Sequence, residues 1–379
     1  MEQMFYISLF LSGYSYFIYP LLLRLLPVRY VGRDDSSDES YIASMTLIIT
    51  VHNEEQRIRG KLENTLQLDY PADSLEVIVA SDCSTDETDA IVESYRDRGV
   101  RLVRADEHKG KEYAQLCAIR EARGDILVFS DVATRIETDA LGKIAQVFSD
   151  PVIGAVSSED RFVSRDGRVA GEGAYVRYEM WLRRLESERA GLVGLSGSFF
   201  AARREVCADW DNKSCSDFNT ALNCAMQKRI AVSSPAVVGI YQDVKDSALE
   251  YRRKVRTVLR GITAIARHPQ ALSPRHVGWL FAFQVWSHKI LRWAVPWFML
   301  GTLVSSFYLV QAHWFYAAVF AGQLLFYLLV LGGQVFPGLR DRTLVRIPYF
   351  FVQVNLAIAH ATLAFLAGRR MSTWTPSQR

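Results

Sequence analysis

Several short apolar runs in this 379-residue chain end on polar or acidic side chains that could contact a ligand. The run LEVIVA is followed by Asp82, and the run ILVFS is followed by Asp131. A third run, TLIITV, is followed by a polar cluster: His52, Asn53, Glu54 and Glu55. At the ends of their runs, Asp82 and Asp131 are expected to contact a ligand. For Asn53 and Asp86 the sequence leaves two alternatives, ligand contact or the capping of a helix, because Asn and Asp commonly accept hydrogen bonds from free N–H groups at helix starts.

These side chains need a scaffold that brings the ends of the runs together. Between residues 45 and 157, short apolar runs (TLIITV, LEVIVA, VRLV, ILVFS and IGAVS) alternate with longer amphipathic segments. Strands separated by helices of this length predict an α/β fold with a doubly wound, mostly parallel sheet. Ligands bind such sheets beyond the carboxyl ends of the strands. No G-x-G-x-x-G follows the first run, so this edge is not a dinucleotide site.

The composition also predicts membrane-spanning helices. Half of the residues are hydrophobic, which is above the usual range for a soluble protein. The longest stretches without Asp, Glu, Lys or Arg are 3–23, 293–339 and 347–368. A bilayer needs roughly 20 apolar residues per helix, so these stretches predict one, two and one crossings. The first is an anchor rather than a signal peptide, because its basic residues follow it: Arg24, Arg29 and Arg33.

The positive-inside rule places the chain after Arg24 in the cytosol. The orientation of the C-terminal end stays open, because three further crossings would place Arg369 and Arg370 outside, against the same rule. Segment 278–293 mixes aromatic residues with His288, Lys289 and Arg292. That mixture is typical of an amphipathic helix in the membrane interface, and a further crossing is the alternative.

Charge and cysteine content exclude other classes. The net charge of +3 is too small to argue for a nucleic-acid partner. Basic residues gather beside the predicted spans, where attraction to anionic membrane lipids is the ordinary explanation. The five cysteines have no C-x-x-C spacing, so reduced, scattered thiols are expected rather than a disulfide framework or a cysteine metal site.

Long segments of the chain resemble membrane-bound family 2 glycosyltransferases. They include VHNEEQRIRGKLENTLQLDYPADSLEVIVASDCSTDETDAIV, GKEYAQLCAIREARGDILVFSDVAT, YVRYEMWLRRLESERAGLVGLSGSFFAARRE and YRRKVRTVLRG. Relatives of this kind include cellulose, hyaluronan and chitooligosaccharide synthases. The resemblance implies a GT-A fold, a nucleotide-diphosphate sugar as the donor, a glycan or lipid-linked acceptor, and a divalent metal, Mg²⁺ or Mn²⁺.

On the donor side, the resemblance assigns the metal to Asp131, which matches the first acid of the family's D-x-D motif. Ala133 occupies the position of the second acid, so we expect metal affinity that is measurable only with nucleotide present. Asp82 matches the acid that hydrogen-bonds the base or ribose, and a carboxylate that accepts from uracil N3–H favours a uridine donor. The other expected nucleotide-binding residues are Asn53, Glu54, Lys109 and Lys111. For the two lysines, a solvated helix start is the alternative.

On the acceptor side, Asp217 matches the base that takes the proton of the attacking hydroxyl. The alternative is an N-cap of the helix expected over 218–227. Gly197, Ser198 and Phe199, in GLSGSFF, match the acceptor loop, whose aromatic pair could stack on sugar faces; a structural glycine turn is the alternative. The sequence leaves open whether three residues of the preceding helix face the acceptor or the core: Tyr178, Glu179 and Glu186.

The family's Q-x-x-R-W segment is replaced here by RRKVRT, which lacks both Gln and Trp. Arg253 and Arg256 could still bind the leaving diphosphate, because a guanidinium binds phosphate through two hydrogen bonds. Contact with lipid headgroups is the competing interpretation of these arginines.

These observations divide the chain into four segments: a transmembrane anchor (1–33), a cytosolic GT-A domain (34–245), interfacial amphipathic helices (246–293), and C-terminal transmembrane helices with a tail (294–379). They predict an inverting hexosyl- or N-acetylhexosaminyltransferase at the inner membrane, acting in exopolysaccharide or cell-surface polysaccharide synthesis. Polymer elongation and single sugar addition both stay open. The alternative from another class is a catalytically idle, nucleotide-binding scaffold or regulator, suggested by the altered D-x-D and Q-x-x-R-W motifs.

Overall fold

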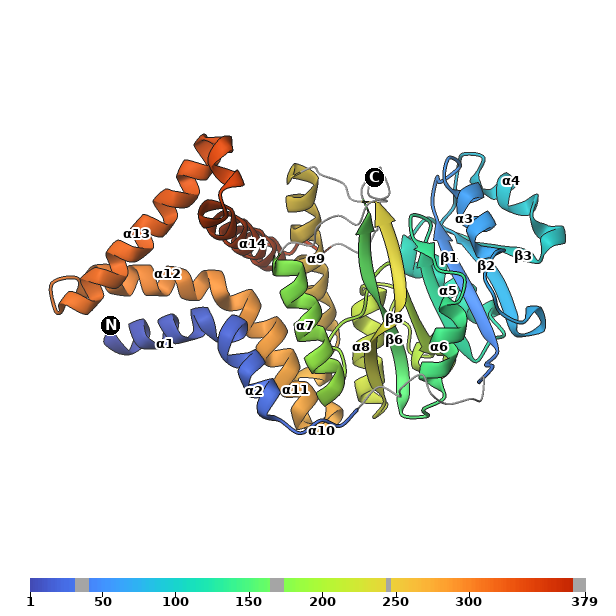
Figure 1. Cartoon of the computed structure of the whole chain (residues 1–379), viewed down its shortest axis with the longest axis horizontal. Helices are drawn as coiled ribbons and strands as arrows, with labels where there is room; N and C mark the ends of the chain where they lie inside the picture. Colours follow the sequence, from blue (N-terminus) through green and yellow to red (C-terminus); the bar gives the residue numbers. More distant parts are fainter. Residues whose placement is uncertain (31–40, 164–173, 243–246, 371–379) are drawn as a thin grey trace. The chain divides into compact units, whose positions relative to one another are not determined.

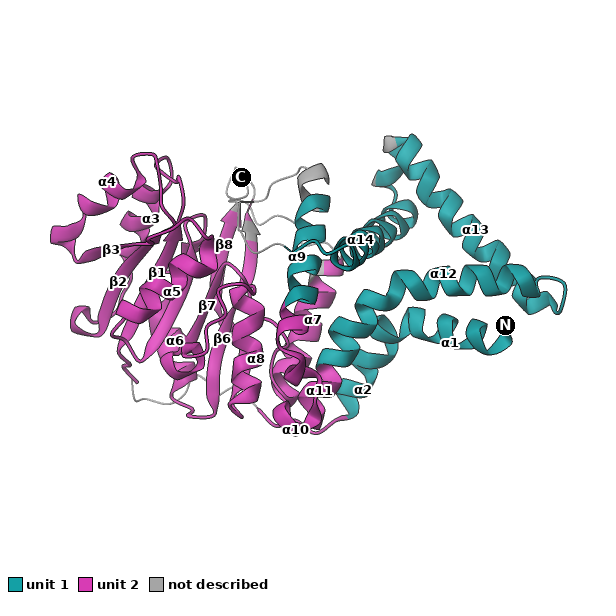
Figure 2. Cartoon of the chain, turned by 180° about the vertical axis from the view of Figure 1, so that it is seen from behind, with its two compact units in different colours: residues 1–25, 246–263, 285–370 teal, residues 26–245, 264–284, 371–379 magenta. Residues whose placement is uncertain are grey.

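The computed structural model describes residues 1–30, 41–163, 174–242 and 247–370. The described chain divides into two compact units, coloured separately in Figure 2. One, the sheet unit, consists of residues 26–245 and 264–284. The other, the helical unit, consists of residues 1–25, 246–263 and 285–370.

The sheet unit is built on one eight-stranded sheet with the order β3-β2-β1-β4-β7-β6-β8-β5 (Figure 1). Its strands are β1 (Met45–Val51), β2 (Leu75–Ser81), β3 (Val100–Arg104), β4 (Ile126–Asp131), β5 (Arg135–Ile136), β6 (Ile153–Val163), β7 (Phe199–Arg203) and β8 (Ile230–Gln242). The five strands expected from the apolar runs are all present. Neighbours among β3, β2, β1 and β4 pair in parallel, as do β6 and β8. Strand β7 pairs antiparallel with β4 and β6, and β5 pairs antiparallel with β8, so the sheet is mixed.

Helices cover both faces of this sheet, which explains why the strands read as continuous apolar runs. Every residue of β1 is buried, and its side chains alternate between two core clusters. The cluster that contains Leu47 and Ile49 is completed by α3 (Ile58–Thr65), α4 (Thr88–Glu93) and α6 (Ala140–Phe148). The cluster that contains Ile48 is completed by α5 (Lys111–Glu121) and α8 (Ser216–Met226). The other helical elements that lie wholly in this unit are α7 (Ala174–Arg189), α10 (Pro274–Val277) and the short turns η2 (Ala72–Ser74), η3 (Arg96–Arg98), η4 (Arg204–Cys207) and η5 (Pro269–Leu272).

The parallel strands end together at one edge of the sheet. Val51 at the end of β1 pairs with Ser81 at the end of β2. Thr50 pairs with Asp131 at the end of β4. The polar residues that follow these strands therefore share one edge, which we call the carboxyl rim.

Within the described residues, four helices are long and apolar enough to cross a membrane by length and composition: Glu2–Leu25, Trp279–Leu309, Trp314–Val335 and Thr343–Leu366. The first comprises α1 (Glu2–Gly13), a π-helical turn (Tyr14–Ile18) and α2 (Tyr19–Leu25); the second comprises α11 (Trp279–Val285), a π-helical turn (Trp286–Ile290) and α12 (Leu291–Leu309). The others are α13 (Trp314–Val335) and α14 (Thr343–Leu366), with the turn η7 (Pro337–Asp341) between them. Four candidate spans agree with the number of crossings expected. The domain boundary expected between residues 293 and 294 falls inside one continuous helix, since a helix of 31 residues runs through it.

The helical unit packs through small and aromatic side chains. Gly301 lies so close to α1 that a Cβ there would be 2.7 Å from Ser8 Oγ. Phe5 meets Tyr316 edge to face at 4.8 Å between ring centroids, and Ser15 Oγ donates to the carbonyl of Ser287 at 2.9 Å. Small residues allow such close backbone approach between apolar helices. Helix α9 (Ser247–Arg267) begins in this unit.

Candidate active site at the carboxyl rim

Asp131, at the end of β4, is paired with the ammonium group of Lys111. Lys111 Nζ lies 2.5 Å from Asp131 Oδ1 and also donates to the carbonyl of Gly197 at 2.7 Å. The Lys111 side chain is 8% exposed and that of Asp131 is 26% exposed. The structure thus brings the expected metal residue, one expected nucleotide-binding residue and the expected acceptor loop into direct contact.

The turn after Asp131 is held from two sides. The N–H of Asp131 donates to the carbonyl of Ser198 at 2.9 Å, and Thr134 Oγ1 donates to the same oxygen at 3.2 Å. From the other side, Lys61 Nζ donates to Ser130 Oγ and to the carbonyl of Thr134, both at 2.7 Å. These hydrogen bonds fix the position of the turn that carries the Asp131 carboxylate.

Lys61 is a buried cation that the sequence analysis missed. Burial lowers the pKa of Lys61 to about 7, although the nearby Asp131 carboxylate acts in the opposite direction. The signal that could have found it is its position on the buried face of α3, together with Ile58 and Leu62. A lysine three residues after one apolar side chain and directly before another is a candidate for burial.

Asp217 lies in the first turn of α8, and its carboxylate faces Gly197. A Cβ at position 197 would lie 3.2 Å from Asp217 Oδ2. The helix cap is Cys215, so Asp217 is not the N-cap that the alternative interpretation required. Within the described ranges its carboxylate accepts no hydrogen bond, and the residue is partly exposed. Gly197 therefore connects Asp217 on one side with Lys111 and Asp131 on the other.

The segment that leads into α8 is anchored by Asp211. Arg267 binds its carboxylate through Nε at 2.5 Å and Nη2 at 2.9 Å, and His268 Nε2 lies 3.0 Å from the same group. Ser214 Oγ also donates to it, at 2.8 Å. Burial alone would raise the pKa of Asp211, but the hydrogen bonds from Arg267 and Ser214 outweigh it and hold the pKa well below its usual range. This network positions the start of the helix that carries Asp217.

Asp82 is fully buried and organises the loop before α5. Its Oδ1 accepts from the backbone N–H groups of Lys109 (3.2 Å) and Gly110 (3.1 Å). Gly110 has a φ of 96°, a conformation that favours glycine, and it directly precedes Lys111. Asp82 therefore places Lys111 at the helix start, from which it reaches Asp131.

The two lysines of the KGK motif have different environments. In contrast to Lys111, Lys109 has a 47% exposed side chain that pairs with Glu107 at 3.0 Å and lies over the ring of Tyr113 at 4.8 Å. This is the solvated environment that the alternative interpretation describes. A donor contact by the Lys109 side chain stays a prediction.

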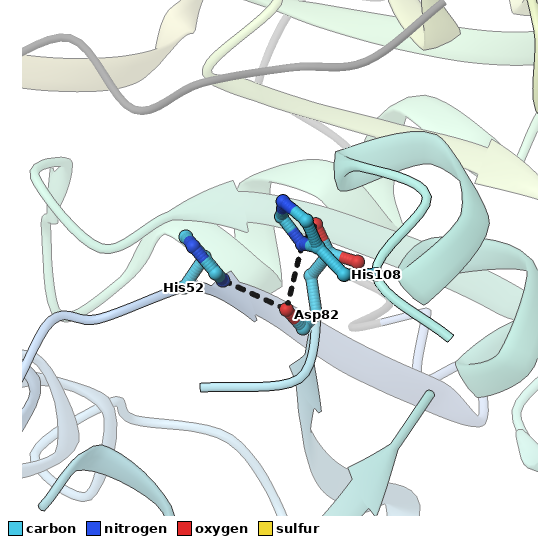
Figure 3. A group of neighbouring side chains, drawn as sticks. All are labelled: His52, Asp82 and His108. Atoms are coloured by element: carbon cyan, nitrogen blue, oxygen red, sulfur yellow. Dashed lines mark hydrogen bonds and ion pairs between the residues drawn. The ribbon is translucent and has the colours of Figure 1, made fainter. Parts of the chain in front are cut away.

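Two histidines flank Asp82. His52 Nδ1 and His108 Nδ1 lie 2.7 and 3.2 Å from the Asp82 carbonyl oxygen (Figure 3), and His108 Nδ1 also lies 3.0 Å from Asp82 Oδ2. The two imidazole rings are stacked, with centroids 4.4 Å apart. His52 was expected only as a polar residue after a strand, and no role was expected for His108. The available signal was a histidine beside each of two motifs that meet on the same rim.

The first loop connects the ends of β1 and β2. Asn53 is exposed and accepts from the N–H of Thr85 at 2.8 Å, in a left-handed conformation with φ of 52°. Glu54 is buried and receives two hydrogen bonds from Arg57, at 2.7 and 2.9 Å. Burial raises the pKa of Glu54, and Arg57 opposes this shift. Neither residue caps a helix with its side chain, because the cap of α3 is Arg57.

Asp86, in contrast, fits the capping alternative. Its Oδ1 accepts from the N–H of Thr88, the first residue of α4, at 3.0 Å. Its Oδ2 accepts from the N–H of Glu55 at 3.1 Å. Asp86 thus satisfies backbone donors at a helix start and ties the two loops together.

The acceptor loop differs from the expectation in one respect. Phe199 is 0% exposed and Phe200 is 1% exposed, and they belong to opposite core clusters because they alternate along β7. Neither ring is available to stack on a sugar while the sheet is intact. In the preceding helix, Glu186 is 1% exposed and faces the interior, whereas Trp181, whose ring lies 5.9 Å from that of Tyr178, is 40% exposed.

Arg253 and Arg256 lie on α9 in the helical unit, whereas Asp82, Asp131 and Asp217 lie in the sheet unit. Their contact with a diphosphate stays a prediction.

The oxygen groups around Asp131 fit a hard divalent cation that is completed by other ligands. Asp131 supplies one partly exposed carboxylate, Ala133 supplies no ligand atom, and Thr134 Oγ1 is committed to Ser198. Magnesium and similar ions are commonly held by one or two carboxylates together with phosphate oxygens and water. Next to this group, Asp217 supplies a carboxylate that can accept a proton.

Comparison with known proteins points to one family. Residues 46–210 match the model of glycosyl transferase family 2. The chain is 27% identical over 192 residues to the beta-monoglucosyldiacylglycerol synthase of Synechocystis sp., covering 48% of this chain and 40% of that protein. It is 23% identical over 183 residues to the poly-beta-1,6-N-acetyl-D-glucosamine synthase of Staphylococcus epidermidis, covering 46% of this chain and 44% of that protein. The chain thus spans less than half the length of these curated relatives.

A solved structure shares the fold over almost the whole chain. It is the mannosyltransferase from Pyrobaculum calidifontis in complex with GDP-Man and Mn²⁺, with a TM-score of 0.73 and 22% identity. The similarity covers 97% of this chain and 100% of that one. Together with the mixed sheet and its helices, this similarity identifies the GT-A fold.

Proposed function

Because residues 46–210 form a glycosyl transferase family 2 domain, we propose that the chain is an inverting glycosyltransferase. It transfers a hexosyl or N-acetylhexosaminyl group from a nucleotide-diphosphate sugar, with a UDP-sugar as the preferred donor, to a glycan or lipid-linked acceptor. Support for this range of products comes from the two sequence relatives, of which one is named for a glucosyl lipid and the other for a poly-N-acetylglucosamine.

The observation that carries the proposal is the position of Lys111 and Gly197 between two acids. The Lys111 ammonium bonds both to Asp131 and to the Gly197 carbonyl, and the open side of Gly197 faces Asp217. Residues from one strand end and two helix starts thus converge on one glycine. This arrangement supports a donor side at Asp131 and an acceptor side at Asp217.

In the proposed reaction, the Asp217 carboxylate takes the proton of the acceptor hydroxyl as its oxygen attacks the anomeric carbon. A bond forms between these two atoms while the bond from the anomeric carbon to the diphosphate oxygen breaks, and the nucleoside diphosphate leaves with the bonding electrons. One direct displacement inverts the anomeric centre, by the same logic as in inverting glycosidases. Proton transfer to a positioned base contributes ~10²–10⁴ in rate.

On the donor side, a divalent metal held by Asp131 would offset the negative charge of the diphosphate. Lys111, beside Asp131, would supply a second positive charge to the phosphates once metal and donor are bound. Asn53 is the exposed nucleoside contact, and Asp82 and Glu54 set the loops around it. Lys109 contributes at the surface of the same loop. Arg253 and Arg256 are proposed to bind the leaving diphosphate.

On the acceptor side, Gly197 and Ser198 shape the place where the hydroxyl approaches Asp217. The absence of a side chain at position 197 leaves room for the acceptor, since even a Cβ would touch the carboxylate. The backbone of Ser198 couples this loop to the turn that carries Asp131. Phe199 supports the loop from within the core rather than by stacking on a sugar.

The helices suited to crossing a membrane support a location in the inner membrane, with the sheet unit in the cytosol, where nucleotide sugars are made. Arg24, in the last turn of the first candidate span, supports this orientation by the positive-inside rule. The acceptor would then be a membrane lipid or a glycan that grows at the membrane surface.

A panel of nucleotide sugars tests this function. Purified full-length protein in lipid nanodiscs is incubated with labelled UDP- and GDP-sugars and membrane lipid extract, with Mn²⁺, Mg²⁺ or EDTA. We expect metal-dependent consumption of one UDP-sugar and a labelled product whose size separates a polymer from a single addition. Consumption of a GDP-sugar alone would correct the donor, and consumption of no donor would contradict the proposal.

A catalytically idle, nucleotide-binding homologue is the second candidate function. Ala133 in place of the second motif acid and the Lys111 ion pair at Asp131 favour it, because both weaken metal binding. This candidate predicts nucleotide binding without donor consumption in the same panel.

A further inference from the structure

Tyr241 is a buried side chain near the end of β8 that the proposed mechanism does not use. It is 3% exposed. In the antiparallel pair of β5 and β8, Arg135 lies opposite Ile240. Because the two strands run in opposite directions, the residue before Arg135, which is Thr134, comes opposite Tyr241. Tyr241 therefore lies beside the turn that carries Asp131.

The ring of Tyr241 lies back over Gly239, which is two positions earlier and on the same face of the strand. A Cβ at position 239 would lie 2.5 Å from Tyr241 Oη. On the neighbouring strand β6, Asp160 pairs with Gly239. Asp160 Oδ1 in turn accepts a hydrogen bond from Ser196 Oγ at 2.7 Å. The missing side chain at Gly239 thus leaves room for the Tyr241 hydroxyl to approach Asp160 and Ser196.

The Tyr241 hydroxyl interacts with the side chains of both Ser196 and Thr134. Ser196 already donates its own proton to Asp160, and Thr134 donates its proton to the carbonyl of Ser198. Burial raises the pKa of Tyr241, so its hydroxyl keeps its proton. A tyrosine hydroxyl can donate, and serine and threonine oxygens can accept. Tyr241 is therefore the donor among these three hydroxyls.

The two partners of Tyr241 belong to the two sides of the proposed centre. Thr134 lies in the turn that carries Asp131, and Ser196 directly precedes the glycine that faces Asp217. A hydroxyl that contacts both segments fixes the spacing between them, and with it the spacing between the two acids. Sugar transfer depends on that spacing, because a misplacement of about 1 Å can cost ~10²-fold in rate.

We propose that Tyr241 is a positioning residue for sugar transfer, whose hydroxyl holds the Asp131 turn and the acceptor loop at the spacing that the reaction needs. This role rests on the proposed function, whereas the bridge between the two segments exists in the protein without substrate. Because Tyr241 is buried, it acts through these segments rather than on donor or acceptor. Its loss should lower turnover and leave the affinity for the donor unchanged.

Hydrogen–deuterium exchange of the full-length protein in lipid nanodiscs tests the bridge without substrate. Tyr241→Phe removes the hydroxyl and keeps the ring. We expect backbone exchange in both segments, 131–134 and 195–198, to become roughly two- to tenfold faster, the effect of one lost hydrogen bond on a local opening equilibrium. Gly239→Ala should accelerate exchange in the same two segments, because its Cβ displaces the hydroxyl without removing it.

Tyr70→Phe is the matched control, since it removes a tyrosine hydroxyl from the same unit. The Tyr70 hydroxyl bonds to the backbone N–H and carbonyl of Ala43, at 2.9 and 2.7 Å. Ala43 precedes the start of β1 and thus lies at the opposite end of that strand from the carboxyl rim. Tyr70→Phe should leave exchange in 131–134 and 195–198 unchanged.

Turnover and donor affinity of the same variants separate positioning from general damage to the fold. Tyr241→Phe and Gly239→Ala should each lose at least about tenfold in kcat with an unchanged donor Kd, whereas Tyr70→Phe should retain both. The proposal is overturned if Tyr241→Phe exchanges like the wild type, if only one of the two segments exchanges faster, or if Tyr241→Phe turns over like an active wild type. A wild type that consumes no donor would refute the proposed function itself, and the exchange rates would still decide whether the bridge exists.

Discussion

The ion pair between Lys111 and Asp131 predicts how tightly the protein binds metal without nucleotide. Asp131 is the only acid that this chain keeps in the D-x-D motif, and Lys111 Nζ lies 2.5 Å from its Oδ1. A divalent cation at Asp131 must displace this ammonium group or bind beside a like charge. Replacement of Lys111 by methionine keeps the length and apolar body of the side chain and removes the charge. Lys111→Met should therefore bind Mn²⁺ more tightly than the wild type when nucleotide is absent.

The size of the effect follows from the bond that metal must break. A hydrogen bond between charged groups contributes about 1.5–3 kcal/mol. Each 1.4 kcal/mol is a factor of about ten in affinity. Asp131 is 26% exposed, so solvent screens part of the pair and the lower end of the range applies. We expect a gain of at least about tenfold in Mn²⁺ affinity.

Calorimetric titration of MnCl₂ into the purified protein, with and without UDP, measures this gain. Lys109→Met is the matched control, because Lys109 lies two residues away with an exposed ammonium paired to Glu107. It should leave the affinity without nucleotide unchanged. The reasoning is refuted if Lys111→Met binds Mn²⁺ no better than Lys109→Met, or if the wild type already binds Mn²⁺ tightly without nucleotide.

Three further substitutions test the surroundings of the two acids. Gly197→Ala places a Cβ 3.2 Å from Asp217 Oδ2, so turnover should fall about tenfold with unchanged donor affinity. Gly60→Ala is the control and should have no effect, because a Cβ at position 60 has no atom within 4 Å. Lys61 has a pKa of about 7 in the folded state against an ordinary 10.5, so the unfolded state binds more protons between these pH values. The stability of the wild type should therefore rise relative to that of Lys61→Met by about 1.4 kcal/mol per pH unit. Urea unfolding from pH 6 to 10 measures this slope, and equal slopes for the two proteins would contradict the burial of this charge. Asp211→Asn removes the partner of Arg267 and should lower the free energy of unfolding by about 1.5–3 kcal/mol at neutral pH. The difference in stability between wild type and variant should disappear as the pH falls through the depressed pKa of Asp211. A difference that stays constant down to acid pH would contradict the network.

The sequence predicted the parallel half of the sheet because β1, β2 and β4 are largely buried on both faces and read as apolar runs. Strand β7 was expected only in the alternative interpretation, a glycine turn before a strand, because Phe199 and Phe200 were assigned to the acceptor loop. Its place between β4 and β6 depends on antiparallel pairing with segments about 70 and 45 residues away. Only that pairing shows that Phe199 and Phe200 enter the two cores.

The site was predictable where the residue types alone carry the chemistry. Asp131 and Asp217 were expected to act together, and the structure connects them through Gly197. Lys61 was not predictable in its role, because its partners Ser130 and Thr134 lie 69 and 73 positions further along the chain. The stacked pair of His52 and His108 depends in the same way on the order of β1, β2 and β3 in the sheet. Contacts between strand ends follow from topology, which local sequence patterns do not encode.

The central claim is that Asp131 and Asp217 serve one centre, with Asp217 as the base. Donor binding and donor turnover measured side by side for the wild type and Asp217→Asn test it most directly, with Asp73→Asn as an exposed acid control. We expect Asp217→Asn to bind the donor with wild-type affinity in the presence of Mn²⁺ and to lose ~10²–10⁴ in turnover. Turnover by Asp217→Asn at the wild-type rate would contradict it.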